Sequence, residues 1–357
     1  MAFAALLASV LATSAGAEEV VAPAEAPGFD LTRPEIVAFV RRLIDRDRFP
    51  KTAVLATLAE ARPRPELVTA MTRPAEKTLA WWEYRARFVT AGRVAAGAVF
   101  WKEHADELDR AAARFGVAPE FLVAILGVET NYGQAAGTFR ELDTLMTFAF
   151  DYPAREDYFR GELRQFLLLA RELGVDPLTV HGSYGGALGA PQLMPSSYRH
   201  FLASAEERRK ANLWSEWPFV FASVAEFLTT RGWKTGERAL VDVHTLGNRD
   251  VAVSGSIALN ETAGALRRRG VRIDREVPDG APAVLIRAVL KESVAYRVGL
   301  TNFRVISRYN PRINYAMAVC DLAEEIRAAH EAASAPAVAA PEPAAAPAPA
   351  PTPKSPG

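Results

Sequence analysis

The sequence predicts a mainly α-helical protein of the α+β class, with a small β-containing subdomain inserted before the last helix. Apolar residues recur at helical spacing through most of the chain, and Gly or Pro stands near the ends of several of these stretches. Between residues 239 and 307 the pattern changes to short runs of β-forming residues separated by turn residues. With 357 residues, half of them hydrophobic, the chain can build two packed domains or one large domain with a subdomain.

Caps and periodicity predict the individual elements in chain order. Thr32 and Glu35, with Pro34 between them, predict a capping box that opens the first helix. Further helical stretches are expected near residues 79–115, 119–130, 156–173, 222–232 and 313–329. Within the subdomain the runs ALVDV, AVLIRAV and FRVISRY predict strands, and one helix-like piece near residues 260–269 interrupts them.

Both ends of the chain differ from this body. Residues 1–17 combine a short apolar stretch with small residues, and an acidic pair follows, which is the order of a cleaved export signal. A buried N-terminal helix is the alternative for this stretch. Residues 18–30 are expected to form a linker, and residues 334–357 a disordered Pro- and Ala-rich tail, because it lacks large apolar side chains. No cysteine lies near the predicted cleavage site, so no membrane anchor is expected there.

The charge balance and the scarcity of metal ligands argue against several classes of protein. Lys and Arg together number 42, as do Asp and Glu, so no net field favours nucleic acid or an anionic membrane. The single cysteine, Cys320, cannot form an intramolecular disulfide, and the five histidines are scattered without ligand spacing. We therefore expect neither a metal nor another cofactor.

Glu129 is the only charged residue in the apolar run FLVAILGVETNYG, residues 121–133. Apolar surroundings disfavour the charged form of a carboxyl and raise its pKa, so Glu129 is expected to hold a proton near neutral pH. Such a carboxyl can act as a general acid and protonate a glycosidic oxygen. The alternative is a structural Glu that pairs with an Arg or caps a turn.

A glycine-rich segment, GSYGGALGAPQLMPSSY, occupies residues 182–198. Its glycines and prolines prevent a continuous helix and allow the backbone to approach a ligand closely. Ser183 and Gln192 are among the polar side chains that suit the hydroxyl groups of a carbohydrate, whereas a phosphate would favour Lys or Arg. A purely structural loop is the alternative.

The segment RYNPRINYAMAV, residues 308–319, predicts the start of the last helix. Asn310 before Pro311 is typical of an N-cap followed by the first helical residue. A cap does not exclude a second role, because Tyr309, Asn310 and Tyr315 would then lie at a helix mouth where a ligand can be held.

These three segments, in this order, resemble the lytic murein transglycosylase B family. The resemblance covers roughly residues 31–329. It makes residues 31–333 the predicted catalytic region, with the β-containing subdomain at about residues 239–307, and it implies a lysozyme-like core within the helical body. Members of the family cleave peptidoglycan between N-acetylmuramic acid and N-acetylglucosamine without adding water, and leave a 1,6-anhydro sugar. The implied partner is the peptidoglycan glycan strand, and the implied location is the periplasm, with the protein exported and soluble.

The resemblance makes Glu129 the single catalytic acid and base. The Glu of the family motif protonates the leaving oxygen and then accepts the proton of the muramoyl C6 hydroxyl, which attacks the anomeric carbon. Matches to glycan-contacting positions are implied for Ser183, Gln192, Asn310 and Tyr315. Tyr132 is expected to form a wall of the cleft.

Two alternative functions remain. A hydrolase of the lysozyme type would use the same acid together with a second carboxylate. Glu141, Asp143 and Asp151 are the nearby candidates for that carboxylate, and we interpret each of them as structural. A non-catalytic wall-binding protein would keep the cleft without the chemistry.

The sequence departs from the family where some relatives carry a calcium loop. Residues 201–214 read FLASAEERRKANLW, with three consecutive basic residues and with neither Asp nor Gly. Such a segment cannot supply the oxygen ligands that calcium requires, so we expect no bound calcium.

Overall fold

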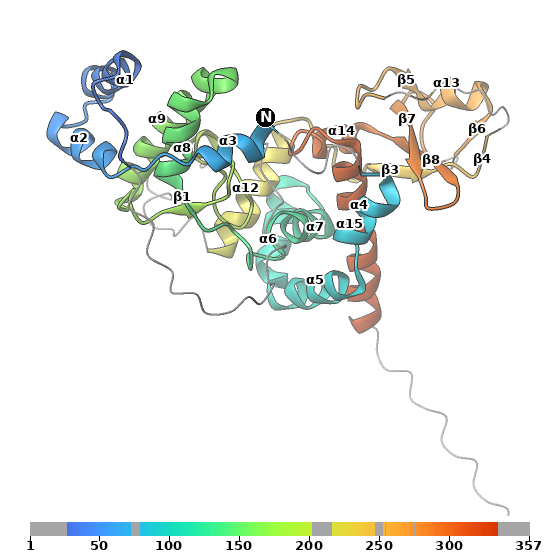
Figure 1. The fold of residues 1–357 in the computed structure, drawn as a ribbon. Helices are drawn as coiled ribbons and strands as arrows, with labels where there is room; N and C mark the ends of the chain where they lie inside the picture. The colour runs from blue at the N-terminus through green and yellow to red at the C-terminus, as the bar shows by residue number, and fades with distance from the viewer. Residues whose placement is uncertain are drawn as a thin grey trace, which may run out of the picture.

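The computed structural model describes residues 27–72, 79–201, 216–246, 253, 255–273 and 276–334. Figure 1 shows a large helical body with a group of short strands at one end of it. The predicted signal peptide, most of the predicted linker and nearly all of the predicted tail lie outside the described residues. The boundaries proposed for these segments therefore stay predictions.

Helices dominate the described residues. In the helical body they are, in chain order, α1 (Pro34–Asp45), α2 (Lys51–Ala59), α3 (Pro65–Thr72), α4 (Trp81–Phe88), α5 (Ala91–Glu103), α6 (Ala105–Phe115), α7 (Pro119–Thr130), α8 (Glu141–Asp151), the 3-10 turn η2 (Pro153–Arg155), α9 (Glu156–Leu173), α10 (Pro195–Phe201), α12 (Trp217–Thr229), α14 (Thr301–Ile306) and α15 (Ile313–Ser334). A two-stranded pair, β1 (Phe139–Arg140) and β2 (His181–Gly182), also lies in this body.

The first helix begins one residue later than the capping box predicts. Pro34 occupies the first turn of α1 as expected, but the N-cap position belongs to Arg33, whose side chain makes no capping hydrogen bond. The Thr32 hydroxyl donates instead to Asp30 Oδ1 at 2.6 Å, and Glu35 pairs with Arg33 at 2.7 Å. The capping-box prediction is therefore wrong, because both of its polar side chains have nearer partners.

The predicted helical stretch at residues 79–115 is divided into α4, α5 and α6. Thr90 is extended and its hydroxyl accepts a hydrogen bond from the Arg93 amide at 3.2 Å, so it ends one helix and caps the next. His104, with φ of −117°, separates α5 from α6. The stretches predicted at residues 119–130 and 156–173 match α7 and α9.

Helix α8 is buried on nearly all of its faces, and no sequence pattern predicts it. Its residues from Glu141 to Phe150 are all buried. It packs against α9 and α3. A helix that is enclosed on all sides lacks the alternation of polar and apolar faces by which helices are detected in a sequence.

The β-containing subdomain is built around a four-stranded antiparallel sheet with the strand order β3-β8-β7-β5. Its elements are β3 (Leu240–Asp242), β4 (Thr245–Leu246), β5 (Glu261–Thr262), α13 (Ala263–Arg268), β6 (Val271–Arg272), β7 (Pro282–Val289) and β8 (Val294–Gly299). The runs ALVDV and AVLIRAV thus supply β3 and β7 as predicted. The run FRVISRY forms α14 instead of a strand, because Phe303, Val305 and Ile306 are buried against the helical body.

Strand β7 joins the subdomain to the helical body. Side chains alternate between the two faces of a strand, and here each face enters a different core. Val284, Ile286 and Ala288 lie in the main core, whereas Ala283 and Leu285 lie in a smaller core with α13. The sheet is therefore packed on the body through one face rather than attached by a linker.

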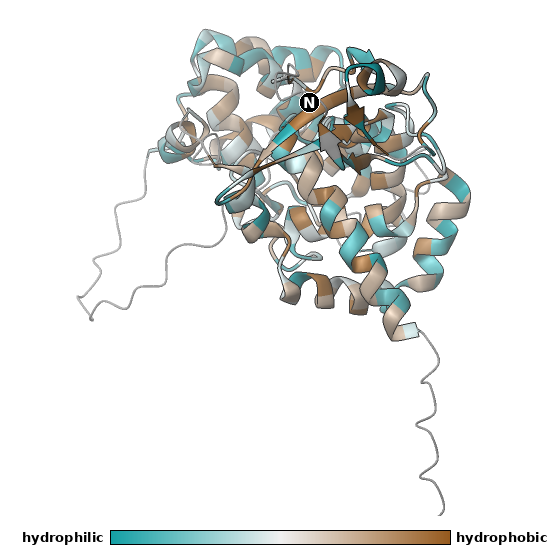
Figure 2. Ribbon diagram, turned by 90° about the vertical axis from the view of Figure 1, so that its right-hand side faces the viewer, coloured by the Kyte–Doolittle hydropathy of each residue, from teal (hydrophilic) through white to brown (hydrophobic). Residues whose placement is uncertain are grey.

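The hydropathy of the chain follows this packing. In Figure 2 individual helices carry both hydrophilic and hydrophobic residues, as expected for helices with one face against a core. Of the described helices, none by itself is long and apolar enough to cross a membrane. Helices α6 and α7 pass this test of length and composition only as a pair, with a bend of 113° between them.

Candidate active site

Glu129 lies in the last turn of α7, at the centre of the helical body. Helix α7 packs against α15, α5, α6 and α12, and every residue from Leu122 to Thr130 is buried. The exposed fraction of Glu129 is 7%. The predicted burial of this carboxyl in an apolar helix is confirmed.

A left-handed turn follows Glu129 and ties the end of α7 to the glycine-rich segment. Asn131, Tyr132 and Gly133 have φ values of 50°, 61° and 85°, so the helix stops abruptly. The Thr130 hydroxyl donates to the Ala190 carbonyl at 2.8 Å and accepts from the Gly133 amide at 3.0 Å. The two motifs that the sequence singled out are therefore adjacent in space.

Tyr315 makes the most direct contact with Glu129. Its hydroxyl donates to Glu129 Oε1 at 2.5 Å, across an interface between α15 and α7. Burial, followed by the nearby charge of Glu129, raises the pKa of Tyr315 well above its usual value. The phenol therefore stays neutral and keeps the proton that it donates to the carboxyl.

Tyr309 lies close to the same carboxyl. Its hydroxyl donates to the Pro191 carbonyl at 2.6 Å, and its ring packs on Phe227 with 4.5 Å between the centroids. Burial and then the charge of Glu129 raise the pKa of Tyr309 well above its usual value. Glu129 thus faces two neutral tyrosines that come from one segment of the chain.

Asn310 does not cap α15. The helix begins at Ile313, and among the described residues the buried Asn310 Oδ1 has no hydrogen-bond partner. Its backbone carbonyl accepts instead from the Arg312 amide at 2.8 Å. The predicted N-cap is wrong, because Pro311 and Arg312 both lie outside the helix, which starts at Ile313. Asn310 Oδ1 is thus an unpaired acceptor next to Tyr309. The second predicted role of Asn310, binding a ligand, stays a prediction.

The glycine-rich segment is held in shape by its own polar side chains. Ser183 Oγ accepts hydrogen bonds from the amides of Gly185 and Ala187 at 3.3 and 3.1 Å. Gln192, in a left-handed conformation with φ of 52°, donates through Nε2 to the carbonyls of Ala136 and Gly189 at 3.0 and 2.9 Å. The Ser183 hydroxyl hydrogen and Gln192 Oε1 are the atoms that these bonds do not use. Glycan binding by the two residues stays a prediction.

Tyr132 is turned toward α5. Its hydroxyl donates to the Arg93 carbonyl at 2.7 Å, and its ring stacks on Phe100 with 5.4 Å between the centroids. A side-chain carbon at Gly97 or Gly127 would collide with this ring or its hydroxyl. These contacts join α5 to α7, so they give Tyr132 a packing role. Its predicted role as a wall of the cleft stays a prediction that none of these contacts supports.

The three acidic neighbours of Glu129 in the sequence differ in their surroundings. Asp143 accepts from the Arg62 amide at 2.9 Å and pairs with Arg140 at 2.7 Å, and Asp151 pairs with Arg33 at 2.7 Å. These two carboxylates have structural partners, as we interpreted them.

Glu141 has no such partner. It is fully buried at the start of α8, and both of its carboxyl oxygens lack a hydrogen-bond partner among the described residues. Burial, and after it the charge of Glu162, raises the pKa of Glu141 well above its usual value. Side chains at Gly182 or Gly186 would collide with or crowd its oxygens, so Glu141 lies directly beneath the glycine-rich segment. Its position gave no signal in the sequence, since an acidic residue in the first turn of a helix is common.

Metal ligands do not gather in the described part of the chain, where no group of three or more His, Cys, Asp or Glu side chains is placed to hold an ion. The segment at residues 201–214, for which we expect no calcium, lies outside the described residues apart from Phe201. That expectation stays a prediction.

A buried carboxyl that receives a hydrogen bond from a neutral tyrosine, beside a glycine-rich segment with polar side chains, is the arrangement expected of a lysozyme-like enzyme that cleaves glycans. Comparison with known proteins gives the family. Residues 32–324 match the model of the transglycosylase SLT domain, and the chain belongs to this family. The predicted mainly helical, lysozyme-like fold class is thereby confirmed.

Named relatives agree with this assignment. The chain is 32% identical over 305 residues to membrane-bound lytic murein transglycosylase B of Escherichia coli strain K12, a match that covers 83% of each chain. The structure of soluble lytic transglycosylase SltB1 from Pseudomonas aeruginosa is 39% identical, has a TM-score of 0.79, and is matched over 84% of this chain and 100% of that one. SltB3 from the same organism, solved in complex with NAG-NAM-pentapeptide, is 25% identical with a TM-score of 0.69, over 82% and 78% of the two chains.

Proposed function

We propose that this chain cleaves the β-1,4 bond between N-acetylmuramic acid and N-acetylglucosamine in peptidoglycan, with Glu129 as the acid and then the base. The observation that carries the proposal is the 2.5 Å hydrogen bond from Tyr315 to Glu129, within the fold of a transglycosylase family. The names of the relatives support the substrate, since one is a murein transglycosylase and another binds a NAG-NAM-pentapeptide.

In the first step Glu129 donates a proton to the glycosidic oxygen. Because Tyr315 donates to Oε1, the transferred proton would be carried by Oε2. The bond between that oxygen and the muramoyl anomeric carbon breaks, and the N-acetylglucosamine side leaves as an alcohol. The Tyr315 hydrogen bond then stabilises the carboxylate that remains, because a donated hydrogen bond favours the charged form.

In the second step the Glu129 carboxylate accepts the proton of the muramoyl C6 hydroxyl. The C6 oxygen forms a bond to the anomeric carbon and closes a 1,6-anhydro ring, so no water enters the product. The carboxyl ends the cycle protonated, as it began. One carboxyl therefore serves both steps, and the structural partners of Asp143 and Asp151 are compatible with that scheme.

Substrate positioning in this scheme falls to the segments that surround Glu129. Asn310 Oδ1 is a buried acceptor in want of a donor, and a sugar hydroxyl or N-acetyl amide would satisfy it. On the glycine-rich segment the Ser183 hydroxyl would add a donor and Gln192 Oε1 an acceptor. Tyr309, which is fixed by its hydrogen bond to the Pro191 carbonyl, would hold the neighbouring Asn310 in position.

The proposed place of action is the periplasm. Peptidoglycan lies outside the cytoplasm, and residues 1–17 have the order of an export signal. Processing after Ala17 in a secreting cell, read from the N-terminus of the mature protein, would test this part of the proposal.

The decisive experiment is digestion of purified peptidoglycan by the mature protein, followed by mass analysis of the released muropeptides. We expect ends in the 1,6-anhydro form, which are lighter by one water than reducing ends. Predominantly reducing ends would instead identify a hydrolase of the lysozyme type. The variant Glu120→Gln, which makes the same change at the other end of α7, is the matched control for Glu129→Gln and should release the same products as the wild type.

A further inference from the structure

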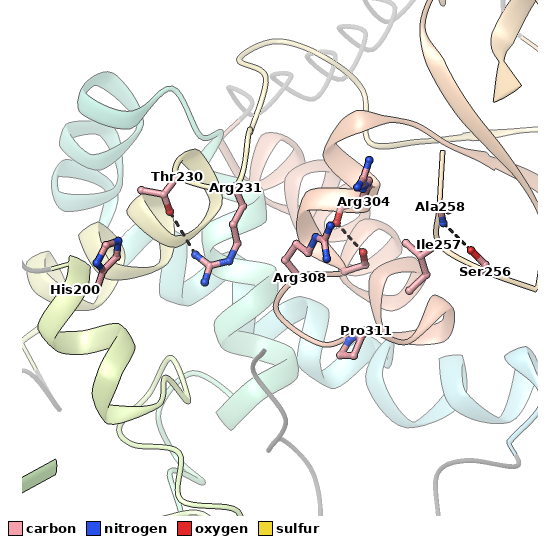
Figure 3. A pocket seen from close by; sticks show the side chains of 10 residues that line it. His200, Thr230, Arg231, Ser256, Ile257, Ala258, Arg304, Arg308 and Pro311 are labelled. Atoms are coloured by element: carbon pink, nitrogen blue, oxygen red, sulfur yellow. Dashed lines mark hydrogen bonds between the residues drawn. The ribbon is translucent and has the colours of Figure 1, made fainter. Parts of the chain in front are cut away.

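A cavity with a volume of about 740 Å³ lies beside the segment that carries Tyr309 and Asn310. Figure 3 shows its lining, to which α10 contributes His200, the residues after α12 contribute Arg231, and α14 with the turn that follows it contributes Arg304 and Arg308. Ser256 and its neighbours close it from the subdomain side. None of the described lining residues is acidic and three of them are arginines, so these residues give the cavity a positive charge.

Two of its arginines have their charges available. Arg304 and Arg308 are exposed, and neither guanidinium forms an ion pair or a hydrogen bond with any residue of the described ranges. Arginine side chains elsewhere in the molecule are mostly engaged, as in the Arg164 pair with Asp47 and the Arg199 pair with Glu172. The contrast indicates that these two charges are not needed to hold the fold.

The third arginine is positioned by its own helix. The Arg231 guanidinium lies 3.5 Å from the centre of the Phe227 ring, and its Nη1 donates to the Phe227 carbonyl at 3.1 Å. Burial lowers the pKa of Arg231, and the positive charge of Arg308 lowers it further. Two like charges are therefore held near each other, and an anion between them would relieve their repulsion.

The cavity and the active site share one segment of the chain. Arg308 and Pro311 line the cavity, and between them Tyr309 and Asn310 belong to the site. The Phe227 ring that supports Arg231 also packs against Tyr309. A substrate held at Asn310 with an anionic branch would therefore bring that branch within reach of the arginines.

We infer that this arginine-lined cavity binds a carboxylate of the peptide stem carried by the muramoyl residue. The inference rests on the proposed function, because the lactyl carboxyl of each stem-bearing muramoyl residue is blocked by its amide bond to the stem, and the stems then carry the carboxylates. Arginine matches a carboxylate in geometry as well as charge, through two parallel hydrogen bonds. The cavity would thus select stem-bearing strands over strands from which the stems have been removed.

Binding of short ligands tests the inference without relying on turnover. The disaccharide NAG-NAM with its lactyl carboxyl amidated carries no charge and lacks the bond that the enzyme is proposed to cleave, so calorimetry can compare this disaccharide with NAG-NAM-pentapeptide on the active protein. We expect the wild type to bind the pentapeptide form more tightly. The double variant Arg304→Gln, Arg308→Gln should lose about tenfold in affinity for that form while its affinity for the bare disaccharide falls far less.

A matched control removes the same charge elsewhere. Arg41 and Arg42 are exposed on α1, and Figure 1 shows α1 at the other end of the helical body from α14, which contributes to the cavity, so Arg41→Gln, Arg42→Gln should leave both affinities unchanged. A pentapeptide form with amidated carboxyls should bind the wild type about as weakly as the unamidated form binds the Arg304, Arg308 double variant.

The outcomes separate the two proposals. Equal binding of the two ligands by the wild type, or full affinity for the amidated form, would overturn the stem proposal alone. If the wild type bound neither ligand, the glycan site itself, and with it the proposed function, would also be overturned.

Discussion

Glu129 and Glu141 are buried carboxyl groups on consecutive helices, and their surroundings differ in one respect. Tyr315 donates a hydrogen bond to Glu129, whereas both oxygens of Glu141 lack a partner among the described residues. Both lie next to the glycine-rich segment, Glu129 through its neighbour Thr130 and Glu141 beneath Gly182 and Gly186.

If Glu129 is the catalytic carboxyl, as we propose, burial alone does not make a carboxyl catalytic. A general acid must give up its proton and then survive as a carboxylate, which requires a donor in place to stabilise the charge. Glu129 has that donor. Glu141 has none, so its charged form would be unsupported, and it is expected to remain a neutral group that packs under the loop.

The largest expected effect comes from exchanging each carboxyl for an amide. Glu129→Gln should lower kcat by about 10² to 10⁴-fold, because Gln keeps the shape but cannot donate an acidic proton. Glu141→Gln should leave kcat close to that of the wild type. Release of anhydro-muropeptides from purified peptidoglycan measures both rates. Comparable losses in the two variants would remove the distinction between the carboxyls.

A smaller loss of kcat is expected when Glu129 is deprived of its hydrogen-bond donor, so that it resembles Glu141. Tyr315→Phe removes the hydrogen bond to the carboxyl and keeps the ring in the core, where Tyr315 is fully buried. A hydrogen bond to a charged group contributes about 1.5–3 kcal/mol, which corresponds to roughly a 10- to 100-fold fall in kcat. Tyr198→Phe is the matched control, since the Tyr198 hydroxyl is also buried but donates to the Leu188 carbonyl. An effect of equal size on kcat in both variants would point to packing rather than to support of Glu129.

Asn310 extends the comparison to a second unpaired buried atom. Its Oδ1, like the Glu141 oxygens, has no partner in the described part of the chain, but it lies beside Tyr309 in the proposed site. Asn310→Leu, which keeps the branching at the γ carbon but has no polar atoms, should raise KM by about 3- to 10-fold through loss of one neutral hydrogen bond to the substrate. Thr144→Val removes another buried, unpaired oxygen, on α8, and should leave KM unaltered. An unchanged KM in both would mean that Asn310 does not touch the glycan.

Local signals in the sequence predicted some of these features and missed others for identifiable reasons. The bounds of α7 were predictable because Pro119 opens the helix and the apolar run ends at a turn. Helix α8 has no periodic pattern, because it is buried on nearly all of its faces. The segment of α14 predicts a strand because Phe303, Val305 and Ile306 favour strands, yet it forms a helix in which all three are buried. In such segments tertiary packing overrides local propensity.

Some features of the candidate site could likewise be predicted from the sequence, whereas others depend on the fold. The isolation of Glu129 in an apolar run is visible in the sequence, and its burial followed. The contact between Tyr315 and Glu129 joins residues 186 positions apart in the sequence. The Asn-Pro pattern and the resemblance of the motifs pointed to Tyr315 as a ligand-binding residue, but its bond to the carboxyl depends on the packing of α15 on α7. Neither the arginine-lined cavity nor the unpaired state of Glu141 has a local pattern, since both depend on which segments the fold brings together.

The smallest effect should appear in stability, at Glu141. Its pKa in the folded state lies above its usual value of 4.5, owing to burial and then to the charge of Glu162. The folded state therefore keeps a proton that the unfolded chain releases, so the contribution of Glu141 is most favourable below that usual value and declines as the pH rises toward the folded pKa. Glu141→Gln cannot ionise, and its free energy of unfolding should match that of the wild type at about pH 4 and exceed it increasingly toward about pH 8. Urea denaturation at several pH values measures this difference, and the matched variant Glu120→Gln should show a weaker trend, because Glu120 is only partly buried. If the free energies of unfolding of Glu141→Gln and the wild type differed by the same amount at every pH, Glu141 would be ionised in the folded protein. The contrast between Glu141 and Glu129 would then have to be explained by access to the substrate.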